Sequence, residues 1–171
     1  MASLVVAMVV TVQAGESVVR QGSNDDLEFK VLHSPVTVET SLDEFIPLPS
    51  GKRWTVPPPE HFYCDGVTIE RIQLKKVVVG QVGGPGFYNA LHVSVDLRVR
   101  SQENDMAADV EFALIDGERH LHLGKIVDIR VNAGESESEG GTFTISQADR
   151  ESWLGAGKHP TLRVTMTTRA N

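Results

Sequence analysis

The feature that most constrains the fold is an alternation of apolar and polar residues in the middle of the chain. From Leu91 to Val99 every second residue is Leu or Val, and the residues between them are polar. Because successive side chains of a strand point to opposite faces of a sheet, this period of two predicts a half-buried β-strand. A helix would spread both sets around its circumference, so the pattern argues against a helix here.

A β-hairpin is predicted shortly after this strand, with Asp116-Gly117 as its two-residue loop. Asp-Gly is favoured in a type I′ turn, whose two central residues both have positive φ. This loop would bring the apolar residues of both strands to one face of the hairpin. The predicted cross-strand pairs are Phe112 with Leu121, Val110 with Leu123, Glu111 with His122, and Ala113 with His120.

The composition indicates an all-β protein. The 171 residues are 40% hydrophobic, which is enough for a core, and Gly, Pro and Asp-Gly separate short Val- and Thr-rich segments. From residue 67 onward, six to eight strands with turns every 8–12 residues predict an immunoglobulin-like antiparallel β-sandwich with one or two short helical turns. We divide the chain into an N-terminal arm and a sandwich domain over 66–171. The arm consists of residues 1–14, either a signal peptide or a first strand, and of N-terminal strands with a Pro-rich connecting segment over 15–65.

Several local features are predicted as well. The alternation of apolar and polar residues changes phase near Arg71, which indicates a β-bulge. The acidic Ser/Gly stretch Asn132–Gly141 is interpreted as a solvated loop. Ser146 is expected to cap a short helix that ends at Gly155 or Gly157 and packs on the sandwich through Trp153. Other expected elements are strands at Leu27–Val31, Val36–Thr40 and Leu162–Met166, one helical turn at Ser41–Phe45, and a turn at Asp65-Gly66.

Charge and cysteine content exclude some functional classes. The net charge is −7 with scattered Lys and Arg, so no nucleic-acid partner is expected. No segment has the roughly 18 consecutive apolar residues of a membrane span. The single cysteine, Cys64, rules out an intramolecular disulfide and a Cys-based zinc cage, and it is interpreted as a small buried hydrophobic residue rather than a reactive thiol.

The first 14 residues have two interpretations. The apolar run Leu4–Val12, followed by Gln13-Ala14, is typical of a secretory signal peptide and its cleavage site, which would place the protein outside the cytoplasm. The run lacks a preceding basic segment, however, and its valines also suit a first β-strand. If that strand is retained, the protein is cytoplasmic.

One candidate metal site follows from the predicted hairpin register. Glu111, His120 and His122 would share its outer face, where two imidazoles and a carboxylate could bind a divalent metal such as zinc. His92 or Asp96 could join them if their strand were adjacent. The simpler interpretation is an exposed polar face with a Glu111–His122 pair and no cofactor.

Four aromatic residues form a second candidate site. Trp54, Tyr63, Phe87 and Tyr88 lie in or beside predicted loops, where exposed rings could stack on a sugar. General burial statistics favour the other interpretation, that they fill the ends of the sandwich core.

The first functional hypothesis is a non-enzymatic, extracytoplasmic β-sandwich that binds or assembles with a protein partner, itself included, through loops or an exposed strand edge. A carbohydrate-binding module and a metal-binding hairpin are the alternatives. No motif of a serine hydrolase or a phosphate-binding loop is present.

Overall fold

A computed structural model describes residues 35–57, 62–78 and 90–171. Strands predominate in these ranges, with a single short helix among the described residues. The elements are β1 (Val36–Ser41), β2 (Arg53–Thr55), β3 (Tyr63–Cys64), β4 (Val67–Val78), β5 (Leu91–Ser101), β6 (Met106–Asp116), β7 (Arg119–Val131), β8 (Ser136–Ile145), α1 (Gln147–Leu154) and β9 (Thr161–Ala170).

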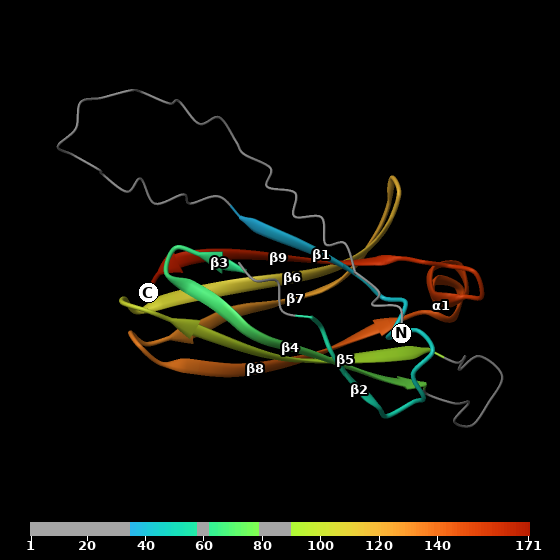
Figure 1. Ribbon diagram of the computed structural model, residues 1–171, viewed down its shortest axis with the longest axis horizontal. Helices are drawn as coiled ribbons and strands as arrows, with labels where there is room; N and C mark the ends of the chain where they lie inside the picture. Colours follow the sequence, from blue (N-terminus) through green and yellow to red (C-terminus); the bar gives the residue numbers. More distant parts are fainter. Residues whose placement is uncertain (1–34, 58–61, 79–89) are drawn as a thin grey trace, which may run out of the picture.

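The strands form two antiparallel sheets that pack face to face, as Figure 1 shows. Sheet A has the order β1-β9-β6-β7. Sheet B has the order β2-β4-β5-β8, and β3 also pairs with β4. The predicted all-β sandwich is therefore confirmed, while its immunoglobulin-like character in particular remains a prediction.

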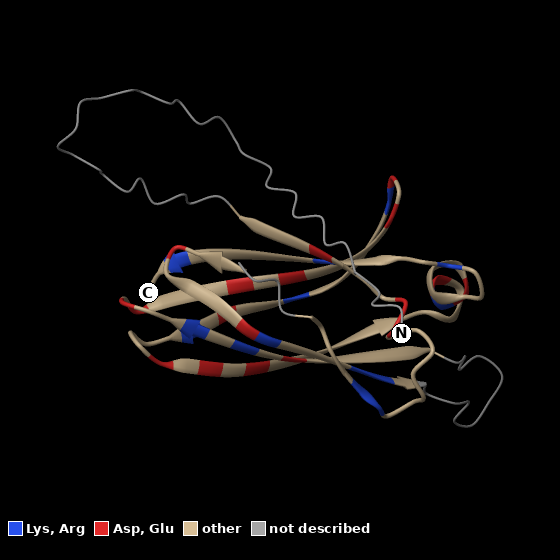
Figure 2. Ribbon diagram, in the orientation of Figure 1, with Lys and Arg blue, Asp and Glu red and all other residues tan. Residues whose placement is uncertain are grey.

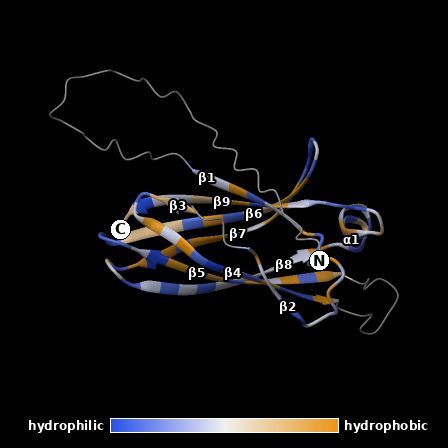
Figure 3. Ribbon diagram, viewed as in Figure 1, coloured by the Kyte–Doolittle hydropathy of each residue, from blue (hydrophilic) through white to orange (hydrophobic). Residues whose placement is uncertain are grey.

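The alternating pattern explains why the sheets pack. In β5 the apolar residues from Leu91 to Val99 are all buried, whereas the residues between them are half-buried or exposed. Figure 3 shows the same alternation of apolar and polar residues along the strands. Both sheets contribute to one core, in which Phe112 of β6 contacts Phe143 of β8 with ring centroids 5.5 Å apart.

The hairpin between β6 and β7 exists, but its predicted register is wrong. Asp116 pairs with Arg119, so the loop residues are Gly117 and Glu118, and only Gly117 has positive φ. Leu114 therefore lies opposite Leu121, Ala113 opposite His122 and Ile115 opposite His120. Each of these side chains still points to the predicted side of the sheet, because the observed register differs from the predicted one by two residues.

A second change of register follows within the same hairpin. Between Phe112 and Ala113 the pairing shifts by one residue, since Ala113 pairs with His122 whereas Phe112 pairs with Gly124. Leu123 is the extra residue of this bulge, so it does not lie opposite Val110.

The predicted loop at Asn132–Gly141 is also wrong over most of its length. Ser136–Gly141 is the first half of β8, and it pairs with β5 from Ser136 opposite Arg100 to Gly141 opposite Val95. A strand is recognised by apolar residues at every second position, and this stretch alternates Glu with Ser, so its sequence does not indicate a strand. The backbone of β5 nevertheless provides the pairing.

Most of the other local predictions are confirmed. Asp65 and Gly66 have φ values of 48° and 82° and form the turn between β3 and β4. The pairing of β4 with β5 shifts between Ile69 and Arg71, where a bulge was expected. Ser146 accepts a hydrogen bond from the backbone N–H of Asp149, and Trp153 of α1 is buried.

The segment before residue 66 contributes strands to both sheets. β1 pairs with β9 in sheet A, and β2 and β3 both pair with β4 in sheet B. Between β1 and β2 the predicted helical turn is present, with the N–H of Ile46 bonded to the carbonyl of Leu42. The predicted strand Leu27–Val31 and the segment 1–14 lie outside the described residues.

Candidate binding surfaces

The predicted pair of Glu111 and His122 lies on the outer face of sheet A. His122 Nδ1 is 3.0 Å from Glu111 Oε1, although the backbone of Glu111 pairs with Lys125. His120 is an exposed neighbour on β7. In the described part of the chain no three His, Cys, Asp or Glu side chains are grouped so that they could hold a metal ion. His92 and Asp96 lie on β5 in the other sheet, so they do not join this pair.

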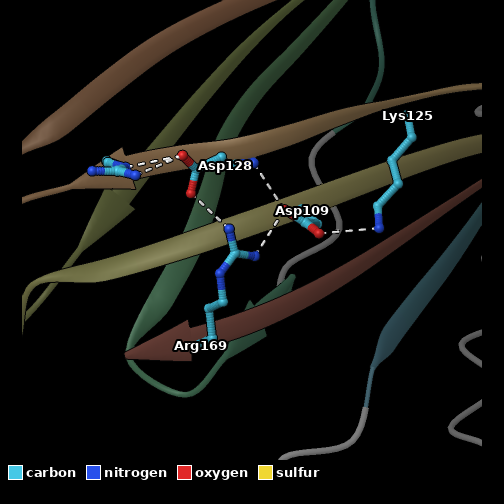
Figure 4. Close-up of polar contacts among 5 residues, drawn as sticks. Asp109, Lys125, Asp128 and Arg169 are labelled. Carbon is cyan, nitrogen blue, oxygen red and sulfur yellow. Dashed lines mark hydrogen bonds and ion pairs between the residues drawn. The ribbon is translucent and has the colours of Figure 1, made fainter. Parts of the chain in front are cut away.

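A larger polar network lies on the same face around Asp109, which interacts with three neighbours (Figure 4). Its carboxylate accepts a hydrogen bond from the backbone N–H of Asp128 at 2.8 Å and from Arg169 at 3.0 Å, and it lies 3.0 Å from Lys125 Nζ. Arg169 also contacts Asp128, which in turn pairs with Arg130. Two carboxylates are thus paired with three cations, and these contacts link β6, β7 and β9.

The four aromatic candidates do not form a common platform. Trp54 is only 9% exposed and packs against Phe45 at 5.8 Å between ring centroids, so the prediction that its ring is presented to a sugar is wrong. Its indole N–H donates to Glu44, which explains how a tryptophan is tolerated in that place. Tyr63 is 48% exposed. Phe87 and Tyr88 lie outside the described residues.

Cys64 is buried, as predicted, and lies between the two sheets. Its Sγ is 3.4 Å from Thr168 Oγ1, and Thr168 donates a hydrogen bond to Asp65. Burial raises the pKa of the Cys64 thiol, which disfavours the nucleophilic thiolate.

The first half of β8 is an acidic strand edge. β8 is an outer strand of sheet B and pairs with β5 alone among the described strands. Glu137 and Glu139 lie opposite the buried residues Val99 and Leu97, yet both carboxylates are exposed. Within the described ranges neither has an ion-pair or hydrogen-bond partner. Figure 2 shows the acidic residues repeating along this strand.

The opposite edge of sheet B carries a basic patch, which we define as Lys52, Arg53 and Lys75. Arg53 and Lys75 are directly opposite each other in the pairing of β2 with β4, and Lys52 precedes Arg53. Like charges in this arrangement repel each other. None of the three has a carboxylate within ion-pair distance in the part of the chain that the structure describes. The patch joins residues about twenty positions apart, so sequence reasoning missed it.

The chain matches no protein-family model, and no curated protein matches it in sequence. In the described ranges no helix has the length and apolarity needed to cross a bilayer.

Proposed function

We propose that this protein is a non-enzymatic binding or assembly module that recruits a protein partner by strand addition at β8. The observation that supports this most directly is the free edge over Ser136–Gly141, where Glu137 and Glu139 have no partner among the described residues. The outer side of an edge strand has backbone N–H and C=O groups without strand partners, and these can pair with an incoming extended segment.

The side chains of β8 define what kind of segment would bind. None of the residues from Ser136 to Gly141 is buried, so the described part of the chain leaves this edge accessible. Two copies of β8 in contact would bring carboxylates close together, which disfavours pairing of the strand with itself. A segment with Lys or Arg at alternate positions would instead meet Glu137 and Glu139 with opposite charge. The expected partner segment is therefore extended and basic.

A second copy of this chain is one source of such a segment. The basic patch is centred on β2, the outer strand at the other edge of sheet B. Pairing of β8 in one copy with β2 in the next would be a head-to-tail contact, which gives rings or open chains rather than a symmetric dimer. Sedimentation of the protein alone at increasing concentration distinguishes self-assembly from binding to another protein.

The proposal is tested with two extended peptides that differ only in charge. One alternates Lys with Thr and Val, and the other has Glu in place of Lys. We expect the basic peptide to bind about tenfold or more tightly than the acidic one at low salt. Amide shifts and protection from hydrogen exchange should be concentrated at Ser136–Gly141, as measured by NMR.

A charge-reversed protein provides the control for this binding. Glu137→Lys with Glu139→Lys should abolish the preference for the basic peptide. Glu103→Lys with Glu118→Lys changes the net charge equally, at exposed loop residues outside β8, and should leave the preference nearly intact. Equal affinity for both peptides, or equal loss in both variants, would refute strand addition at β8.

We further propose that the protein acts outside the cytoplasm. The supporting feature is the apolar run Leu4–Val12 before Ala14. The intact mass of protein from its native host tests this, because secretion predicts loss of the first 14 residues, whereas a retained Met1 contradicts it.

A further inference from the structure

An apolar groove lies at the end of the sandwich that carries α1. The connection between β1 and β2 contributes Phe45, Ile46, Leu48 and Ser50, the two central strands of sheet B contribute Lys76 and Leu91, and α1 contributes Arg150 and Leu154. The groove has a volume of about 230 Å³. Pockets for drug-sized ligands have volumes of roughly 300–1,000 Å³, so this groove suits a smaller molecule. It is separate from the β8 edge and independent of the function proposed there.

The lining combines two chemical characters. Five of the lining residues are apolar, two are cationic, and Ser50 is the only other polar one. Of the described residues, none with a carboxylate lines the groove. A ligand that fits this lining has an apolar body and a negative charge.

Lys76 is the residue that gives the groove its preference for an anion. Its ammonium group donates a hydrogen bond to the carbonyl oxygen of Ile46 and lies 5.4 Å from the centre of the Phe45 ring. Among the described residues no carboxylate pairs with it. Burial and the nearby positive charge of Arg150 both lower the pKa of Lys76. A bound anion would offset the desolvation and the repulsion between these two cations.

We propose that this groove binds a small anionic amphiphile, an aliphatic monocarboxylate whose chain contacts Phe45, Leu91 and Leu154 and whose carboxylate meets Lys76 and Arg150. The aliphatic chain loses apolar surface to water on binding, and the carboxylate gains charge-assisted hydrogen bonds. Neither the chain nor the carboxylate alone is sufficient for tight binding, because the groove is small and both cations are only half-buried.

The test uses octanoate as the probe with the full-length protein. Calorimetry measures affinity, and methyl NMR of Ile46, Leu48, Leu91 and Leu154 locates the site. We expect saturable binding of one octanoate per chain with shifts at these methyl groups. Acetate lacks the apolar chain and octylamine has the opposite charge, so both should bind about tenfold or more weakly.

Matched variants test whether the positive charges that line the groove bind the carboxylate of octanoate. Lys76→Met keeps an unbranched apolar side chain without the ammonium group and should weaken octanoate binding about tenfold. Lys75→Met removes the same charge from the adjacent residue, which belongs to the basic patch, and should change the affinity by less than about twofold. Circular dichroism shows whether Lys76→Met folds. If it does not, Arg150→Met on α1 is the second test.

Three results would overturn the proposal. They are octylamine binding as tightly as octanoate, no saturable octanoate binding up to its solubility limit, and octanoate affinity that is unchanged in folded Lys76→Met and Arg150→Met proteins. Each leaves the peptide binding predicted for β8 unaffected, so failure here does not imply failure there.

Discussion

Asp109 shows how a single carboxylate holds the outer face of sheet A. Partial burial alone would raise its pKa, but the hydrogen bonds from the backbone N–H of Asp128, from Arg169 and from Lys125 outweigh that effect and lower the pKa to about 2. Asp128 has a φ of 56°, in the left-handed region that non-glycine residues rarely adopt. Its bond to Asp109 therefore also stabilises an unfavourable backbone conformation next to the bulge at Ala108–Val110.

The first prediction concerns the Asp109→Asn variant, measured by urea unfolding at several pH values. At pH 7 we expect the free energy of unfolding to fall by about 1–2 kcal/mol, because the three partners of Asp109 lose a negatively charged acceptor. Folding lowers the pKa of Asp109 from 3.8 to about 2. This contribution to stability is therefore fully present above pH 3.8 and is lost as the pH falls towards about 2. The two proteins should therefore converge in acid.

Glu111→Gln is the control for Asp109, because it removes a more exposed carboxylate from the same strand and face. At pH 7 it should cost less than Asp109→Asn. A difference between wild type and Asp109→Asn that grows as the pH falls would contradict the assigned role of Asp109.

At the scale of elements, β7 has one position beside its bulge where a side chain would collide with the opposite sheet. Gly124 lies opposite Phe112, directly after the extra residue Leu123. A Cβ atom at Gly124 would overlap the ring of Phe143, which belongs to the other sheet and packs on Phe112. Close approach of the two sheets at this point therefore depends on the missing side chain.

The second prediction is that Gly124→Ala lowers the free energy of unfolding by about 1–3 kcal/mol through overpacking. Phe143→Leu should relieve the overlap, so the double variant should be more stable than the sum of the two single effects predicts. Thermal or urea denaturation of the four proteins measures this coupling. Strict additivity would show that the ring of Phe143 does not oppose a side chain at residue 124.

Elements with a distinctive local pattern could be predicted from the sequence, and others could not. The strand at Leu91–Val99 and the cap at Ser146 are recognisable because their residues suit one structure only. The hairpin register was missed because Gly117 can occupy either loop position, and here it is the first, followed by Glu118. Ser136–Gly141 was missed because its strand depends on pairing with β5 rather than on its own residues.

The same reasoning applies to the candidate sites. Glu111 and His122 were predicted to meet, and they do so although their backbones are not paired. The burial of Trp54 depends on Phe45 and Glu44, which reach it from the preceding turn, and no periodicity indicates this. The groove and the basic patch bring together residues from separate elements, so they emerge only with the folded chain.

At the scale of the whole molecule, charge is distributed unevenly although the chain is acidic overall. The outer face of sheet A neutralises its own charges, whereas sheet B has an acidic strand at one edge and the basic patch at the other. Electrostatic complementarity of this kind directs association and its specificity more than it adds affinity. Binding at β8 should accordingly weaken steeply with salt, because exposed charges are screened.

The central claim is that Ser136–Gly141 forms an edge strand of a two-sheet β-sandwich. NOE spectroscopy of the labelled protein tests it most directly. We predict cross-strand contacts between the backbones of Glu137 and Val99 and between those of Glu139 and Leu97, with strand chemical shifts throughout. Random-coil shifts over residues 136–141 without contacts to β5 would contradict it.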